Sequence, residues 1–211
     1  MLDLARRYDV QGFLFASTSS VYGPLPTPWT EDLPANQPLS PYAATKRAAE
    51  IMAYTQHYLH GTPTCIVRFF TVYGPRGRPD MTPYLFVDAM LKRQPIVLFD
   101  GGVGVHRDWT YVDDIVAGVV AALDADMAFE IFNLGNSSPV QLCDFVALLE
   151  RITGVSAIVE PRPLPAADPR ITYANTDKAR RMLGFQPRTT VEQGLARFWQ
   201  WYQEEVQPHE P

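Results

Sequence analysis

Short apolar runs alternate with longer amphipathic segments along the 211 residues of the chain. Apolar runs at 13–17, 64–70, 96–99, 130–134 and 157–160 predict strands, because a buried parallel strand is apolar on both faces. Apolar positions spaced three or four apart predict helices at 41–60, 83–93, 112–125, 138–154 and 176–183, with a last helix after Thr190. Residues 207–211 are predicted to fray. The alternation of strands and helices predicts an α/β fold with a parallel sheet.

Capping residues mark several helix starts. Ser40 before Pro41 is the pattern of an N-cap followed by proline at the first helical position. Ser138 with Gln141 three residues later forms a capping box, which predicts a helix start at this point. In the segment 112–125, six apolar residues are predicted to share one stripe: Val112, Ile115, Val116, Val119, Val120 and Leu123.

Composition and charge argue against several classes of function. Hydrophobic content of 46%, charged content of 19% and a net charge of −5 are ordinary for a globular protein and give no electrostatic case for binding nucleic acid. No run of 18 apolar residues occurs, and charged residues among the first seven argue against a signal peptide, so we expect no membrane partner. Cys65 and Cys143 are predicted to be reduced, which fits a cytoplasmic protein. No histidine, cysteine or carboxylate spacing predicts a metal site.

The helix predicted at 41–60 carries candidate chemistry on one face. Tyr42 and Lys46 are four residues apart, so both side chains point to the same side of the helix. A lysine ammonium beside a phenol favours the phenolate and is expected to lower its pKa from about 10 toward the working range. The pair is therefore a candidate general acid/base, although an amphipathic helix with a surface lysine gives the same spacing.

Polar residues also follow the predicted strands. The strand 13–17 runs into a hydroxyl cluster at 17–20, the strand 64–70 runs into a loop that contains Arg78, and Arg107 precedes the helix at 112–125. Ligands of open α/β sheets bind at the carboxyl ends of the strands. Together with Tyr42 and Lys46, these segments resemble the extended short-chain dehydrogenase/reductase family, the NAD-dependent sugar-nucleotide epimerases and dehydratases, over about residues 10–202.

The resemblance implies NAD as the cofactor and assigns roles around the predicted helix. Tyr42 would be the base that removes the proton from the sugar 4-hydroxyl, and Lys46 would bind the cofactor ribose. Thr18 matches the family hydroxyl that bonds the reacting oxygen, although a turn residue at a strand end gives the same pattern. Ser17 and Phe69, with Tyr42 and Lys46, would contact the cofactor.

The resemblance also implies a UDP-sugar substrate. Arg107 matches the arginine that binds the diphosphate, and its planar fork suits phosphate oxygens, although a surface ion pair with Asp108 is the simpler interpretation. Asp168 matches a contact to the nucleotide ribose, and Phe99 is a weaker candidate for a uracil contact. Pro165 stands where the family often has Arg or Gln, so one substrate contact is expected to be missing.

Residues 68–81 are most similar to UDP-glucuronate 4-epimerases within this family. Thr71, Arg78 and Asp80 match substrate-binding positions, and Thr71 with Arg78 would hold the carboxylate of the sugar. A cation and a hydroxyl are the groups that a carboxylate needs. The resemblance therefore implies conversion of UDP-glucuronate into UDP-galacturonate, by oxidation to a 4-keto intermediate and re-reduction.

One departure from the family pattern concerns the cofactor. The family begins with a strand, a glycine-rich turn and a helix that hold the cofactor pyrophosphate. The glycine cluster at 101–104 leads into His106 and Arg107 rather than into a helix, so we interpret it as a loop. The chain is thus expected to be the C-terminal part of a Rossmann-like doubly wound sheet plus a small α/β substrate lobe.

The expected domain boundaries follow from the resemblance. Residues 1–74 with 107–134 would form a partial NAD-binding domain, and residues 75–106 with 135–211 would form the substrate lobe. The strand 13–17 is expected to leave an uncovered sheet edge, which favours aggregation or pairing with another chain. Members of the family commonly form homodimers through helices that would include residues 41–60.

Three alternatives stay open. The first is the NAD-dependent 4-epimerase. The second is a dehydratase, a decarboxylase or a neutral-sugar epimerase of the same family, although Ser19 and Ser20 stand where dehydratases carry an acid and a base, and Ser20 stands where decarboxylating relatives carry Glu. The third is a non-catalytic module that cannot hold NAD, which the missing glycine-rich turn favours.

Overall fold

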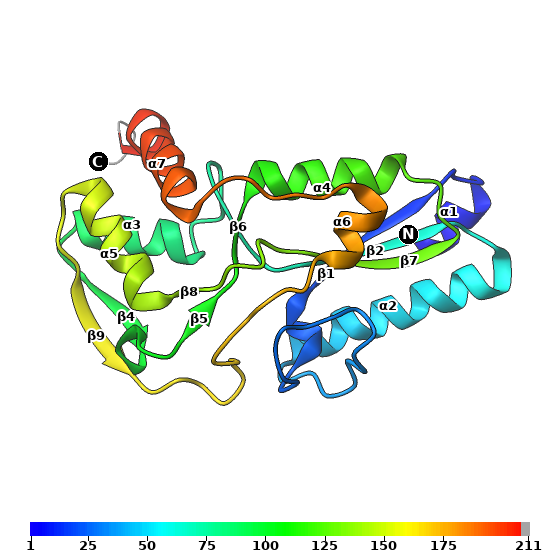
Figure 1. Ribbon diagram of the computed structural model, residues 1–211, viewed down its shortest axis with the longest axis horizontal. Coiled ribbons are helices and arrows are strands. Elements are labelled where there is room, and N and C mark those ends of the chain that lie inside the picture. The colour runs from blue at the N-terminus through cyan, green and yellow to red at the C-terminus, as the bar shows by residue number, and fades with distance from the viewer. Residues whose placement is uncertain (208–211) are drawn as a thin grey trace.

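A computed structural model describes residues 1–207 of the chain (Figure 1). Residues 208–211, which include most of the segment predicted to fray, lie outside the described part. The fold is mixed α/β with parallel pairing between successive strands, as the alternation of elements predicts. Two groups of elements lie side by side along the long axis of the molecule (Figure 1).

The first group is built around a three-stranded parallel sheet of order β1-β2-β7. Its strands are β1 (Phe13–Thr18), β2 (Thr64–Phe69) and β7 (Phe129–Leu134). Phe15 pairs with Ile66, and Ile66 pairs with Ile131 on its other side. The central strand β2 is buried along almost its whole length, because helices cover both faces of the sheet.

Two long helices lie on opposite faces of this sheet (Figure 1). They are α2 (Pro41–His60) and α4 (Val112–Asp124), and the short helix α1 (Leu2–Arg7) contacts α2. The start of α2 is the predicted one, because the Ser40 hydroxyl accepts a hydrogen bond from the Ala43 amide at 3.2 Å. Gly61 ends the helix in the left-handed conformation, with φ of 70°.

The second group combines three helices with short strand pairs. The helices are α3 (Thr82–Leu91), α5 (Leu142–Thr153) and α7 (Val191–Trp201). Strands β4 (Pro95–Phe99) and β9 (Ile158–Arg162) pair in parallel, and β5 (His106–Arg107) and β8 (Val140–Gln141) pair antiparallel. A third pair, β3 (Thr71–Tyr73) with β6 (Trp109–Tyr111), connects the two groups. The chain also forms 3-10 turns at Ser19–Tyr22 and Asp100–Gly102 and a π turn at Tyr202–Val206.

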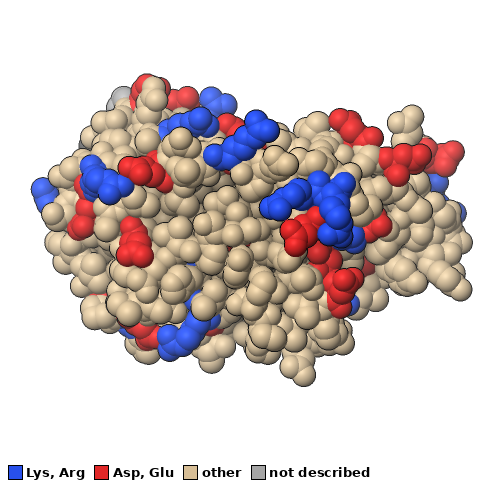
Figure 2. All heavy atoms as spheres, in the orientation of Figure 1, with Lys and Arg blue, Asp and Glu red and all other residues tan. Residues whose placement is uncertain are grey.

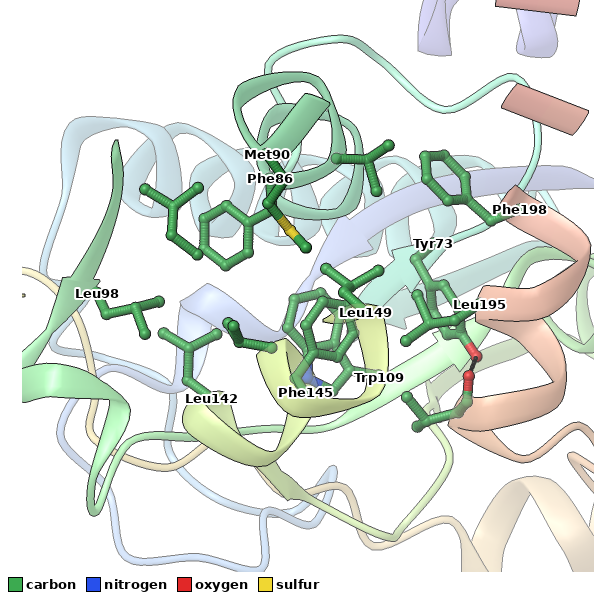
Figure 3. Close-up of a cluster of buried hydrophobic side chains, with 14 of the residues drawn as sticks. Tyr73, Phe86, Met90, Leu98, Trp109, Leu142, Phe145, Leu149, Leu195 and Phe198 are labelled. Carbon is green, nitrogen blue, oxygen red and sulfur yellow. Dashed lines mark hydrogen bonds between the residues drawn. The ribbon is translucent and has the colours of Figure 1, made fainter. Parts of the chain in front are cut away.

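The largest core lies within the second group. Figure 3 shows Trp109 of β6 stacked on Phe145 of α5, with their ring centroids 4.1 Å apart. Leu149 of α5 and Leu195 and Phe198 of α7 fill the space beside this pair (Figure 3). A second core joins α4 to the sheet through residues such as Ile115, and a third holds the loop around Trp29.

The short helix α6 (Asp177–Leu183) packs against α4 and β7. Ala179 and Phe185 belong to the same core as Phe132 of the sheet. The boundary predicted from the sequence assigns these residues to the substrate lobe, although they contact the sheet. The division into two domains therefore stays a prediction.

Two expectations about helix ends and faces differ from the structure. Helix α5 begins at Leu142, not at Ser138, and Gln141 is its N-cap residue. In α4, Ile115 and Ala122 are buried, but Val116, Val120 and Leu123 are about half exposed, at 52%, 49% and 60%. The predicted stripe of α4 is therefore only partly buried.

Charged side chains of both signs are interspersed over the face of the molecule in Figure 2, and neither sign forms a continuous field there. No helix in residues 1–207 is long and apolar enough to cross a membrane. Cys65 is buried and Cys143 is partly exposed, and both thiols are free. Within the described residues, no group of three or more histidine, cysteine or acidic side chains could hold a metal ion.

Candidate active site

The first turn of α2 presents the predicted acid/base pair at the carboxyl end of β1. Tyr42 lies one residue after Pro41 and is 56% exposed, so a ligand can reach its hydroxyl. One turn later, the Lys46 ammonium donates a hydrogen bond to the carbonyl of Ala16 in β1 at 2.9 Å. An ammonium has three donors, so this bond fixes the side chain and leaves donors for a ligand.

The hydroxyl cluster lies at the end of β1, where the strand turns into a 3-10 helix. Thr18 is the N-cap residue of that turn, and its Oγ1 accepts a hydrogen bond from the Ser20 amide at 3.2 Å. Ser17 and Ser19 are buried, whereas Ser20 is exposed. The turn therefore holds Thr18 at the carboxyl end of the parallel sheet, where open α/β sheets bind ligands.

A buried carboxylate behind this cluster was missed by the sequence-based prediction. The Ser17 hydroxyl donates to Glu50 Oε1 at 2.5 Å. Arg68 of β2 donates to both carboxylate oxygens of Glu50, from Nε at 3.0 Å and from Nη2 at 2.8 Å. Burial raises the pKa of Glu50, but the hydrogen bonds and charge of Arg68, together with hydrogen bonds from Ser17 and Arg47, outweigh it, so this pKa lies below its usual value. A charged residue inside the apolar strand 64–70 was the available signal, because a buried arginine requires a partner.

The Glu50 network extends across the sheet. The guanidinium of Arg68 lies over the ring of Tyr22, 4.8 Å from its centroid. The Tyr22 hydroxyl donates to Asn133 Oδ1 of β7 at 2.6 Å. Burial raises the pKa of Tyr22 to about 12, so this phenol is a structural hydrogen-bond donor and not an acid/base group at neutral pH. The network ties α2, β1, β2 and β7 together directly behind the candidate catalytic residues.

Tyr42 borders a small pocket of about 240 Å³. Ser20, Trp29 and Ser40 contribute to its wall, and the opposite side is formed by Ala167 and Asp168 from the loop after β9. The sequence-based prediction missed Trp29 and Ser40 as wall residues, because the segment 24–40 reads only as a proline-rich loop. The pocket has room for one sugar-sized ligand beside the Tyr42 hydroxyl.

A second pocket of about 410 Å³ is lined by three of the predicted substrate residues, Phe99, Arg107 and Asp168. Its other walls are mostly apolar and come from α3 and β4, with Trp109 and Leu142. Because Asp168 lines both pockets, the two adjoin at this residue. The larger pocket is lined by the second group of elements, and the smaller one by the loops around Tyr42 and Trp29.

Arg107 provides the cation of the larger pocket. Its side chain is 17% exposed, and Nη1 donates to the carbonyls of His106 and Arg170 at 2.9 and 3.2 Å. Burial lowers the pKa of Arg107, and the carboxylate of Asp168, 3.9 Å away, opposes that effect. Asp168, not Asp108, is therefore the acidic neighbour of Arg107. The Arg107 guanidinium donates its hydrogen bonds to carbonyl oxygens, which carry no full charge, so it can bind a phosphate.

Asp108 has a structural role, because it binds backbone amides of two loops. Its carboxylate accepts hydrogen bonds from the amides of Asn136 and Ala174, both at 2.8 Å, and from Ser137 at 3.2 Å. Burial raises the pKa of Asp108 to about 6, although these hydrogen bonds act in the opposite direction. The side chain fixes two loops next to Arg107.

The predicted carboxylate-binding residues lie near the start of α3. Arg78 lines a pocket of about 220 Å³ together with Val72, Gly77 and Tyr84. Thr71 is half-buried at the start of β3, and its amide donates to the Asp108 carbonyl at 3.1 Å. Asp80 forms an ion pair with Arg78.

Four of the predicted residues line the two adjoining pockets, and seven do not: Ser17, Thr18, Lys46, Phe69, Thr71, Arg78 and Asp80. Phe69 is half-buried at the end of β2, where it packs on the second core. The glycine cluster forms a 3-10 turn that leads into β5, as predicted for a loop, with φ of 64° at Gly101 and 81° at Gly102. In the described residues, no glycine-rich turn connects a strand to a helix.

Known proteins are similar to this chain in sequence and in fold. The model of the NAD dependent epimerase/dehydratase family matches residues 1–135. A UDP-glucuronate 4-epimerase of Thermodesulfobacterium geofontis is 40% identical over 208 residues, covering 98% of this chain and 64% of that protein. UDP-glucuronate 4-epimerase 3 of Arabidopsis thaliana is 42% identical over 221 residues, covering 96% of this chain and 51% of that protein.

Solved structures give the same result. UDP-glucuronic acid 4-epimerase from Bacillus cereus, in complex with UDP-glucuronic acid and NAD, superposes with a TM-score of 0.90 at 33% identity, covering 96% of this chain and 65% of that one. UDP-glucose 4-epimerase from Thermotoga maritima, with UDP-glucose, superposes with a TM-score of 0.88 at 26% identity, covering 97% and 67%. The chain spans 64% and 51% of the length of the two 4-epimerases compared by sequence, and 65% of the Bacillus cereus protein. The family model matches more than half of the residues of this chain, and the chain belongs to the NAD dependent epimerase/dehydratase family.

Proposed function

We propose that this chain carries the substrate site and the acid/base residues of an NAD-dependent sugar-nucleotide 4-epimerase that acts on UDP-glucuronate. The observation that carries the proposal is that a pocket beside Tyr42 and a pocket with Arg107 share Asp168 in their linings. Relatives named UDP-glucuronate 4-epimerases, about 40% identical over nearly the whole chain, support the choice of substrate.

The larger pocket suits the nucleotide part of the substrate. Its apolar wall, with Phe99 at one end, can pack on a uracil ring, and the Arg107 fork can bind the diphosphate. Asp168 lines both pockets, and we propose that it accepts hydrogen bonds from the nucleotide ribose. The sugar then extends into the pocket beside Tyr42, where the reaction takes place.

Acid/base chemistry at the sugar requires one group that takes and returns a proton at oxygen 4. The Tyr42 hydroxyl is the accessible group for this task, and Lys46 lies one turn later on the same helix. We propose that Thr18, at the end of β1, hydrogen-bonds the same oxygen. The proton that leaves oxygen 4 later returns to it, so Tyr42 ends the reaction in the protonation state in which it began.

The residues of the chain fit only part of NAD. Lys46 has donors left for a ribose, and Ser17 and Phe69 lie at the strand ends where a nicotinamide would be bound. The glycine-rich turn that would hold the pyrophosphate does not occur between a strand and a helix of the described residues. When bound, NAD supplies the acceptor for the hydride from carbon 4 and returns it to the opposite face.

Ser19 and Ser20 favour epimerisation over elimination. A dehydratase needs a further acid and base next to the reacting carbons, and serine hydroxyls do not titrate in the working range. The alternative of a non-catalytic module rests on the missing pyrophosphate turn. Product analysis distinguishes these possibilities, because an epimerase yields UDP-galacturonate, a decarboxylase yields a UDP-pentose, and a binding module yields neither.

The test is turnover of UDP-glucuronate with NAD, measured for the chain and for Tyr42→Phe. We expect UDP-galacturonate as the product and a loss of about 10²–10⁴-fold in kcat for Tyr42→Phe. Tyr58→Phe is the matched control, because Tyr58 is an exposed tyrosine (75%) on the same helix, far from both pockets. Equal activity of wild type and Tyr42→Phe would contradict the assignment of the base.

A further inference from the structure

The guanidinium of Arg78 is already occupied by a carboxylate of the chain itself. Arg78 Nε donates to Asp80 Oδ1 at 2.9 Å, and Nη2 donates to Oδ2 at 2.5 Å. Two parallel hydrogen bonds of this kind are the geometry in which an arginine binds any planar carboxylate. A ligand carboxylate that bound Arg78 in the same way would have to replace Asp80.

The loop keeps Asp80 close to Arg78. Only Pro79 separates the two residues, and the Met81 amide donates to the Arg78 carbonyl at 3.0 Å, which closes a tight turn before α3. A nearby internal carboxylate has a high effective concentration, so it competes with any external one. Asp80 is thus held within reach of Arg78 whether or not a ligand is present.

Arg78 also lies within electrostatic reach of the candidate base. The hydrogen bond and the charge of Asp80 are the main causes that raise the pKa of Arg78, and the charge on Tyr42 adds in the same direction. Both members of the pair are exposed, with 75% of the Arg78 and 66% of the Asp80 side chain accessible, so a ligand can reach them.

We propose that Asp80 is the resting counterion of Arg78, an internal carboxylate that the carboxylate of a uronic acid displaces on binding. The inference rests on the proposed function and makes Asp80 a specificity-determining residue for the charge of the sugar. A neutral sugar leaves the Arg78–Asp80 pair intact. A uronate must break it and then lies beside the released negative charge of Asp80.

The size of the effect follows from the exposure of the pair. Exposed ion pairs are weak, so displacing Asp80 should cost a ligand at most about fivefold in affinity. Removing the charge of Asp80 frees the Arg78 fork and also removes a like charge beside the ligand. Asp80→Asn should therefore tighten binding of UDP-glucuronate by about two- to fivefold and leave UDP-glucose unchanged.

The test is calorimetric titration of UDP-glucuronate, UDP-glucose and UDP into wild type, Asp80→Asn and Arg78→Gln. We expect Asp80→Asn to increase the preference for UDP-glucuronate over UDP-glucose, and Arg78→Gln to abolish that preference. Glu160→Gln is the matched control, because Glu160 and Arg162 form an exposed pair with the same spacing, at 2.8 Å, and the change in net charge is the same.

Three results would overturn the inference. One is unchanged or weaker binding of UDP-glucuronate by Asp80→Asn, and another is an equal gain for UDP-glucose or for Glu160→Gln. In both cases normal binding of UDP would leave the proposed function intact. The third is no binding of UDP by wild type, which would contradict the nucleotide pocket and the proposed function together with this inference.

Discussion

Glu50 shows how much of the site depends on one residue that does not face the ligand. Its carboxylate is 1% exposed and receives hydrogen bonds from Ser17, Arg47 and Arg68. Charged groups away from water are stable only when they are paired and hydrogen-bonded. These hydrogen bonds to Glu50 therefore stabilise the end of β1, the strand that carries Thr18.

We predict that Glu50→Gln lowers the free energy of unfolding by about 3–5 kcal/mol at pH 7, because it leaves the charge of Arg68 buried and unpaired. Because the folded pKa of Glu50 is depressed, its contribution is present above the unfolded pKa and is lost as the pH falls through the folded value. Urea unfolding from pH 7 to pH 3 measures both effects. Glu192→Gln is the control, since Glu192 pairs with Arg151 on the surface and should cost below about 1 kcal/mol.

Asp108 should show the opposite dependence on pH. Burial raises its folded pKa from 3.8 to about 6, so between these values the folded protein binds more protons than the unfolded chain. Its contribution to stability is therefore complete below about pH 4 and falls as the pH rises to 6, by about 3 kcal/mol. The unfolding free energy of wild type minus that of Asp108→Asn should therefore decrease as the pH rises over this range. A value of this difference that stays constant or increases would contradict the prediction.

At the scale of elements, the local signals in the sequence predict helix α2 well. Ser40, Pro41 and Gly61 mark both of its ends, and these signals need no tertiary contact. Helix α5 shows the limit of such signals. Its expected capping box does not form, because Gln141 Oε1 accepts a hydrogen bond from the Gly104 amide and Val140 pairs with Arg107 in β5. These partners lie more than thirty residues away and leave no local pattern.

Helix α4 and the polar residues of the site show a second limit. Spacing identifies the apolar side of α4, but the close approach of Gly118 to Phe185 and Leu134 decides which part of that side is buried. The same reasoning explains why Tyr42, Lys46 and Arg107 could be named from motifs, whereas Glu50 and the Trp29 wall could not. Motifs identify residues that face the ligand, and tertiary packing selects the residues behind them.

We predict that Gly194→Ala in α7 lowers the free energy of unfolding by about 1–2 kcal/mol, although alanine favours helices. A Cβ at Gly194 would overlap the hydroxyl of Tyr73 and crowd the ring of Tyr111, so α7 would have to move away from the core. Gly12→Ala is the control, because a Cβ there meets nothing within 4 Å. Chemical denaturation of both variants and of wild type tests the prediction. A Gly194→Ala variant as stable as wild type would contradict it.

At the scale of the whole molecule, apolar surface is left open on both sides of the sheet. Val116, Val120 and Leu123 of α4 are exposed, and β1 has one partner strand in the described part of the chain. A cavity of about 620 Å³ lies between the start of β1 and the end of α4. On the other side, α2 exposes a run of large residues: Ile51, Met52, Tyr54, Tyr58 and Leu59. We propose that this side of α2 forms the contact of a homodimer.

These surfaces predict that the 211-residue chain associates or has low solubility on its own. The measurement is light scattering coupled to size-exclusion chromatography over a range of protein concentrations. We expect a dimer or larger species at micromolar concentration. A monodisperse monomer that unfolds cooperatively would contradict the prediction.

Calorimetric titration of UDP-glucuronate into wild type and Arg107→Gln tests most directly whether a UDP-sugar binds where the two pockets adjoin. We expect micromolar binding by wild type and at least about tenfold weaker binding by Arg107→Gln, because a charged hydrogen bond to the diphosphate is lost. Melting temperatures of both proteins show whether the variant stays folded. Equal affinity of two folded proteins, or no binding by wild type, would contradict the account.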